Sequence, residues 1–108
     1  MSKEHYYDII KSPAITDLDS LPFPDYDAFG YAGLLEKVKG SDAFFTDVFD
    51  HPRFYPIIAS RSCPFRCTFC YSPLGTKYRQ RSIRSVLDEL REVVPRYRIN
   101  IVQVMDEL

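Results

Sequence analysis

The clearest hydrophobic pattern in the chain is a helical one near its end. In "RSIRSVLDELREVVPRYR" the apolar residues fall on one stripe of a helix: Ile83, Val86, Leu87, Leu90, Val93 and Val94. Ser82 stands before the stripe as the expected N-cap, and Pro95 predicts that the helix stops close to Val94. We expect the stripe to face the core.

Two short apolar runs flank this helix. "FYPIIAS" at 54–60 and "INIVQVM" at 99–105 each predict a strand that is buried on both faces. Strand, helix and strand make a βαβ unit, whose two strands run parallel. Functional groups in parallel α/β folds lie at the carboxyl ends of the strands. A cysteine-rich segment follows the first run, and Asp106 and Glu107 follow the second, so we expect them to converge at one edge of the sheet.

The first third of the chain predicts irregular structure. "KSPAITDLDSLPFPDYDAFGYAG", residues 11–33, has no helix or strand period, and Pro22 and Pro24 hold its centre extended. Its spaced apolar residues indicate a strap pinned to a surface: Leu18, Leu21, Phe23, Tyr26 and Phe29. The residues 34–38 then predict a short helix that ends at Gly40.

Composition narrows the class of protein. With 108 residues, 45% of them hydrophobic and 27% charged, the chain is at most one small soluble domain. It has no run of the roughly 20 apolar residues that a membrane span requires, and no signal-peptide pattern. We therefore expect a cytoplasmic protein without a membrane partner. In that compartment cysteines are metal ligands or redox groups more often than disulfides.

Charge is distributed unevenly along the chain. Residues 1–52 carry four basic and ten acidic groups, a net charge of −6, whereas residues 53–108 carry ten basic and five acidic groups, a net charge of +5. A basic second half suits either an anionic ligand or a nucleic acid. Composition does not separate the two.

A single βαβ unit is too small to be a complete fold. Two parallel strands and one helix leave backbone edges and apolar surface uncovered. We therefore expect residues 1–52 to be a connector that contains the strap, and residues 53–108 to be the first, truncated part of a larger α/β domain, too incomplete to be active by itself.

The chemistry resides in "RSCPFRCTFCYSP", which holds the three cysteines of the chain: Cys63, Cys67 and Cys70. Their Cys-x3-Cys-x2-Cys spacing on one loop allows three thiolates to bind one metal centre. Tetrahedral zinc requires a fourth ligand. A [4Fe–4S] cluster has four irons, so three protein thiolates would leave one iron open to an outside ligand.

This motif, between a strand and a helix and with Phe69 just before the last cysteine, resembles the radical S-adenosylmethionine (AdoMet) signature. The resemblance implies the front portion of a partial (βα)6 barrel. It also implies that the open iron chelates AdoMet, whose one-electron cleavage gives a 5′-deoxyadenosyl radical that abstracts hydrogen from a substrate. By the same resemblance Phe69 lies near the adenine. Asp106 and Glu107 stand where the family contacts AdoMet, although "MDE" replaces the usual Gly-Gly-Glu.

A longer likeness narrows the family. "DLDSLPFPDYDAF", "RFYPIIASRSCPFRCTFC" and "GTKYRQRS" together look like the B12-binding-domain class of radical AdoMet proteins. The resemblance implies cobalamin-dependent methyl transfer or ring formation as alternative outcomes in the intact enzyme, and cobalamin as a further cofactor there. It also implies a small-molecule substrate, which the sequence does not identify, and an electron donor such as flavodoxin or ferredoxin.

Competing hypotheses remain for several residues. A Cys3His zinc site would use His51 or His5 as the fourth ligand, in a zinc-binding or nucleic-acid-binding module without catalytic activity. The basic run 77–84 would neutralise the charge of the cluster and AdoMet or bind an anionic substrate, with Arg79 and Arg81 as the ligand-contacting residues. The alternative is a solvated charge group at the start of the helix. Phe69 would either contact adenine or pack beneath the loop.

Overall fold

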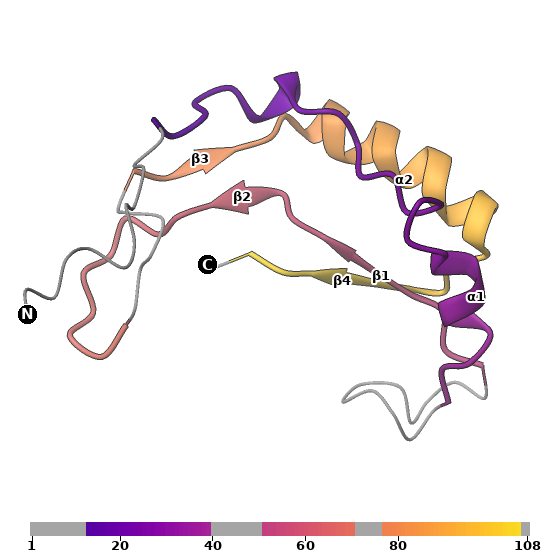
Figure 1. Cartoon of the computed structure of the whole chain (residues 1–108). Coiled ribbons are helices and arrows are strands. Elements are labelled where there is room, and N and C mark those ends of the chain that lie inside the picture. Colours follow the sequence, from indigo (N-terminus) through magenta and orange to yellow (C-terminus); the bar gives the residue numbers. More distant parts are fainter. Residues whose placement is uncertain (1–12, 40–50, 71–76, 107–108) are drawn as a thin grey trace, which may run out of the picture.

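The structure, a computed structural model, describes residues 13–39, 51–70 and 77–106 (Figure 1). Its elements follow in the order η1 (Leu18–Ser20), α1 (Tyr31–Leu35), β1 (Phe54–Ile57), β2 (Ser60–Arg61), β3 (Arg79–Gln80), α2 (Ile83–Tyr97) and β4 (Ile101–Val104). The described strands form two small sheets, β1–β4 and β2–β3.

Strands β1 and β4 pair in parallel, as predicted. Phe54 stands opposite Ile101, and Ile57 opposite Val104. The ladder continues past β4, where the Met105 amide donates to the Ile57 carbonyl over 2.9 Å. Helix α2 connects the two strands, so their carboxyl ends lie at the same edge of the sheet.

Helix α2 begins where the sequence predicts and ends later. Ser82 is its N-cap, with the side-chain oxygen accepting from the Ser85 amide. The expected stop at Val94 is wrong, because Pro95 lies inside the helix, which continues to Tyr97. Pro95 has no amide hydrogen to donate within the helix. The last turn is closed by the Arg98 amide, which donates to the Val94 carbonyl. The helix ends instead at Arg98, whose left-handed backbone has φ 52°.

The core lies between α2, β1 and α1, and consists of Tyr31, Leu35, Tyr55, Ile57, Val93, Tyr97 and Ile99. The predicted stripe supplies Val93 to this core, with Val86, Leu90 and Val94 packed against it. Ile83 and Leu87 are exposed, which corrects the expectation for that side of the stripe. Glu89, which is not part of the predicted stripe, is buried, with 2% of its surface exposed.

Four tyrosines form the centre of this packing: Tyr26, Tyr31, Tyr55 and Tyr97. Their ring centroids lie 4.8–6.3 Å apart in tilted and edge-on pairs. Every hydroxyl has an acceptor, because Tyr55 donates to Glu89, Tyr97 to Asp27, and Tyr26 and Tyr31 to backbone carbonyls of β1. These phenol rings therefore fill apolar space without leaving a polar group unpaired.

The second edge of β1 is covered by the strap rather than by another strand. Tyr26 donates to the Pro56 carbonyl and Tyr31 to the Phe54 carbonyl, on the side of β1 away from β4. Pro56 has no amide hydrogen to offer a neighbouring strand, which suits an edge position. Figure 1 shows the strap running beside α2 and turning into α1 near the start of β1.

Neither strand is buried on both faces, contrary to the prediction. Tyr55 and Ile57 of β1 are buried, whereas Val102 and Val104 beside them are 43% and 62% exposed. Side chains of paired residues lie on the same face of a parallel sheet. Among the described residues, α2 therefore covers the β1 half of this face and leaves the β4 half open.

The strap is pinned to the domain surface, as predicted. Leu18 is buried, and the Asp19 carboxylate accepts from the Ser82 amide at 2.9 Å, at the start of α2. Phe29 and Phe23 are the exceptions among the expected anchors, since they are 83% and 37% exposed. The short helix predicted over 34–38 is α1, which lies earlier, at Tyr31–Leu35. The predicted end at Gly40 is wrong, because the described residues 36–39 before it are not helical.

Candidate functional site

The cysteines lie in residues 62–70, which leave the sheet after β2, and the described chain resumes at residues 77–78, just before β3; we call these described residues the cysteine loop. Strands β2 and β3 pair antiparallel, with Ser60 opposite Gln80 and Arg61 opposite Arg79. The sequence analysis missed this short ladder, because two-residue strands have no detectable period. It closes the base of the loop and so fixes the direction in which the loop leaves the sheet.

Within the loop the three thiols differ in exposure. Cys63 is half-buried, and Cys67 and Cys70 are exposed. The Cys70 amide donates to the Cys67 carbonyl over 3.1 Å, which joins these two in one turn. All three lie in the described part of the chain, and none is in a disulfide. Across that part, no three His, Cys, Asp or Glu side chains lie close enough together to hold a single metal ion.

Phe69 projects from this turn into solvent. It is 91% exposed, so the alternative that it packs beneath the loop is not what the structure has. Phe65, earlier in the loop, is 63% exposed. Two aromatic rings therefore lie open in the same loop as the cysteines.

Ser62 precedes the first cysteine in an unusual backbone conformation. Its φ is 67°, in the left-handed region, and none of its surface is exposed. A residue with a side chain seldom adopts this region unless its surroundings hold it there. The sequence offered no signal for this, because left-handed positions are marked by glycine or asparagine far more often than by serine.

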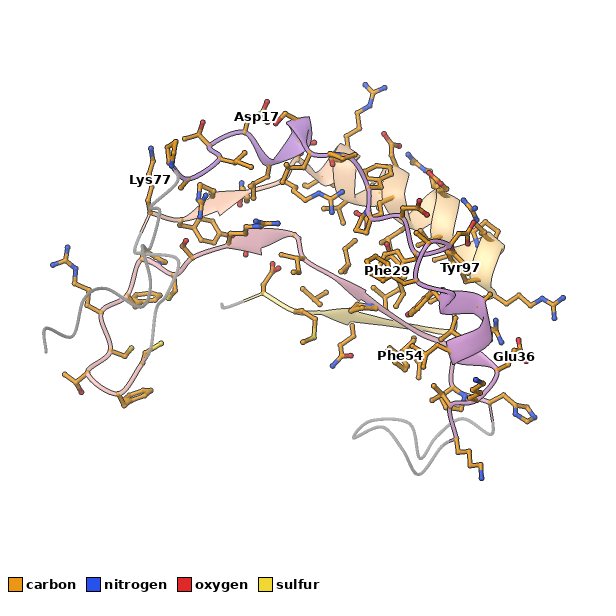
Figure 2. The ribbon with its side chains drawn as sticks, in the orientation of Figure 1. Asp17, Phe29, Glu36, Phe54, Lys77 and Tyr97 are labelled. Carbon is orange, nitrogen blue, oxygen red and sulfur yellow. The ribbon has the colours of Figure 1, made fainter. Side chains whose placement is uncertain are left out.

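Arg79, predicted to contact the cofactor, donates to three protein acceptors in this structure. Nη1 donates to the Ile15 carbonyl at 2.7 Å, Nη2 to Ser62 Oγ at 3.0 Å and Nε to the Lys77 carbonyl at 3.3 Å. It therefore joins the strap to both ends of the cysteine loop. Figure 2 shows Lys77 near the start of the described strap.

Arg81, the second predicted contact, is also engaged within the protein. Its Nη1 lies 2.5 Å from Glu89 Oε2, and Nη2 donates to Ser85 Oγ at 3.0 Å and Nη1 to the Ile58 carbonyl at 3.3 Å. Its guanidinium lies 5.6 Å from the centre of the Phe23 ring. Among the described residues Glu89 Oε2 accepts no well-aligned hydrogen bond, so its contact with Arg81 is an ion pair.

Asp106 stands at the carboxyl end of β4, where the sequence predicted it. Its Oδ1 accepts from the amides of Ala59 at 2.8 Å and Ser60 at 2.9 Å. The carboxylate therefore ties the end of β4 to Ala59 and to Ser60, the first residue of β2, which leads into the cysteine loop. Glu107, the other predicted carboxylate, is outside the described residues.

A cavity of about 370 Å³ lies beside the base of the loop. One wall is the strap between Leu18 and Tyr26, and Ile58 and Met105 contribute to the opposite side. The Arg81–Glu89 pair also lines it. The cavity is therefore mostly apolar, with a charged patch at that ion pair.

The structure does not bring His51 to the cysteines. His51 precedes β1, and its carbonyl accepts from the Asn100 side chain just before β4, at the amino end of the sheet. The cysteine loop leaves from the opposite end. A Cys3His zinc site that uses His51 is therefore not formed here, and His5 is outside the described residues.

Comparison with known proteins finds methyltransferases. An uncharacterized methyltransferase of Pyrococcus horikoshii is 31% identical over 97 residues, which are 88% of this chain and 18% of that protein. The cytidylyl-2-hydroxyethylphosphonate methyltransferase of Streptomyces wedmorensis is 29% identical over 93 residues, 84% of this chain and 17% of that protein. The bacteriochlorophyllide d C-12(1)-methyltransferase of Chlorobaculum tepidum is 47% identical over 38 residues, 33% of this chain and 8% of that protein.

No protein-family profile matches the chain, and no solved structure matches it. In the described part of the chain no helix has both the length and the apolar character to cross a bilayer. The chain spans less than a fifth of the length of the methyltransferases above. Its similarity is therefore to one segment of those methyltransferases.

Proposed function

We propose that this chain supplies the cysteine loop of a radical AdoMet methyltransferase. Cys63, Cys67 and Cys70 would hold a [4Fe–4S] cluster. The observation that carries the proposal is the position of these three thiols, on one loop closed at its base, at the carboxyl edge of a parallel strand pair. Similarity to methyltransferases over most of the chain supports methyl transfer as the outcome.

The donor set suits such a cluster better than a single metal ion. Three thiolates bind three different irons of the cube, so they need not meet at one point. A single zinc ion needs four ligands around one centre, and His51 lies at the opposite end of the sheet from the cysteine loop. When bound, the cluster and AdoMet would together supply a 5′-deoxyadenosyl radical for hydrogen abstraction from the substrate.

The other residues of the site divide into two groups. Phe69 presents an exposed ring beside Cys70, which is available to stack on adenine. Arg79, Arg81 and Asp106 already donate to or accept from protein groups, so in this proposal they shape the site. Glu107, next to Asp106 in the sequence, is then the carboxylate proposed to contact AdoMet.

The proposal extends to the fold and to the partners. A partial (βα)6 barrel would begin at β1, whose outer edge the strap covers. Its next helix and strand would follow β4, whose apolar face is uncovered among the described residues. The likeness of the strap to the B12-binding-domain class adds cobalamin as a second cofactor of the whole protein. A small-molecule substrate and an electron donor such as flavodoxin or ferredoxin complete the set of partners.

The test is metal and sulfide analysis of anaerobically purified protein. We expect about four irons and four sulfides per chain, and loss of both in the Cys63→Ala, Cys67→Ala and Cys70→Ala variants. Thr68→Ala is the matched control, because Thr68 is an exposed loop residue between two of the cysteines without a thiol. About one zinc per chain and no sulfide would overturn the proposal.

A further inference from the structure

The Arg79 side chain links three segments that are distant in the sequence. Its three nitrogens donate to the carbonyl of Ile15 in the strap, to Ser62 Oγ at the start of the cysteine loop and to the carbonyl of Lys77 at its end. The backbone of Arg79 also pairs with Arg61 across the β2–β3 ladder. Both ends of the loop are thus held by one residue.

The most consequential of these contacts is the one with Ser62. That residue is fully buried, has a left-handed backbone and is bonded directly to Cys63 in the chain. Its φ sets the direction in which the backbone enters the loop. A hydrogen bond of 3.0 Å from Arg79 to its side chain therefore restrains the position of the first thiol.

We propose that Arg79 is a positioning residue for the cysteine loop, which holds Ser62 and thereby sets the geometry of Cys63, and which couples that geometry to the strap through Ile15. The inference rests on the proposed function in one respect, namely that the thiols hold a cluster. It differs from the prediction made on sequence, in which Arg79 contacts an anionic ligand.

The chemistry of arginine separates the two roles. A planar guanidinium reaches three acceptors in three directions, whereas the lysine ammonium is a compact point charge on a flexible stem. Arg79→Lys therefore keeps the charge but loses most of the positioning contacts. Arg79→Gln loses both. A positioning role predicts that the two variants behave alike, and an anion-binding role predicts that lysine largely substitutes for arginine.

The first readout does not depend on a cluster. In cluster-free protein, iodoacetamide labelling followed by mass spectrometry gives the alkylation rate of each cysteine. We expect both Arg79 variants to label Cys63 about threefold faster or more, because the segment around Ser62 opens more often, while Cys67 and Cys70 change less than about twofold. Arg84→Gln is the matched control, since the Arg84 side chain is 91% exposed and pairs with Asp88.

The second readout is the electron paramagnetic resonance spectrum of the reduced, reconstituted protein before AdoMet is added. We expect lower cluster occupancy or shifted g values in Arg79→Lys and Arg79→Gln, and the wild-type spectrum in Arg84→Gln. Ser62→Ala removes the same hydrogen bond from the other side. It should reproduce the faster labelling of Cys63, and it provides the test if an Arg79 variant does not fold.

Two results would overturn the inference. In one, Cys63 labels at the wild-type rate in Arg79→Lys, Arg79→Gln and Ser62→Ala. In the other, Arg79→Lys matches wild type in both readouts while Arg79→Gln alone loses AdoMet affinity, which would restore the anion-binding role. A wild-type protein that takes up no cluster would instead contradict the proposed function, and the labelling rates would still decide the role of Arg79.

Discussion

Glu89 is a buried carboxylate on the core-facing side of α2, and each of its two oxygens has a partner side chain. Tyr55 donates its hydroxyl to Oε1 at 2.5 Å, and Arg81 Nη1 lies 2.5 Å from Oε2. Burial, followed by the hydrogen bond with Glu89, raises the pKa of Tyr55 above its ordinary value, so the phenol remains a donor. The three side chains therefore depend on one another, because a buried charge is stable only when it is paired.

We expect Arg81→Met to destabilise the protein by about 3–5 kcal/mol, because it leaves the Glu89 charge buried without its partner. The double variant Arg81→Met/Glu89→Gln should cost less than Arg81→Met alone, since it leaves no unpaired charge and keeps an acceptor for the Tyr55 hydroxyl. Urea unfolding of wild type and the two variants measures both quantities. A double variant less stable than Arg81→Met would show that the charge pair is not the source of the loss.

Asp19 gives the attachment of the strap a defined pH dependence. Hydrogen bonds from the Ser82 side chain and amide hold the pKa of Asp19 below its ordinary value of 3.8. A lowered pKa in the folded state means that the contribution to stability is present above the pKa of the unfolded chain. It is lost as the pH falls through the folded value.

Asp19→Asn should therefore melt at a lower temperature than wild type near pH 6, and the difference should shrink toward zero as the pH falls below 3.8 and through the lowered pKa of Asp19. Thermal unfolding of both proteins across that pH range measures it. Asp17→Asn, a change two residues earlier in the strap, is the control for the loss of one charge. A melting difference that stayed constant with pH would contradict this account of Asp19.

At the scale of elements, the sequence predicted the position of α2 and the parallel pairing, but not their limits. The N-cap at Ser82 was predictable because a serine before an apolar stripe has one common role. The end was not, because it depends on the left-handed turn at Arg98 rather than on Pro95. Pro56 is typical of an edge strand. The apolar residues around it nevertheless favoured the prediction of a strand buried on both faces.

The N-cap of α2 can be tested directly. Ser82→Ala removes the acceptor of the Ser85 amide, which lies 3.1 Å from Ser82 Oγ, and should cost about 0.5–2 kcal/mol of stability. Ser82→Thr keeps an oxygen at that position and should stay within about 0.5 kcal/mol of wild type. Circular dichroism melts of the three proteins give the comparison. Equal losses in both variants would mean that the cap bond does not stabilise α2.

At the scale of the whole molecule, the described chain has one closed side and one open side. The strap satisfies the outer carbonyls of β1 through two tyrosine hydroxyls, whereas Val102 and Val104 leave an apolar surface on β4. The sequence located the cysteine loop and Asp106 at one edge of the sheet. It could not show that Arg79 and Asp106 are engaged by backbone and side-chain partners, because those contacts depend on tertiary structure.

The central claim is that this chain supports radical cleavage of AdoMet, and the most direct measurement is the release of 5′-deoxyadenosine. The intact protein is incubated anaerobically with AdoMet and a one-electron reductant, and the products are quantified by liquid chromatography. We expect 5′-deoxyadenosine from wild type and from Thr68→Ala, and none from Cys63→Ala, Cys67→Ala or Cys70→Ala. S-adenosylhomocysteine formed equally by all five proteins, without 5′-deoxyadenosine, would show methyl transfer that does not use the cysteines and would contradict the account.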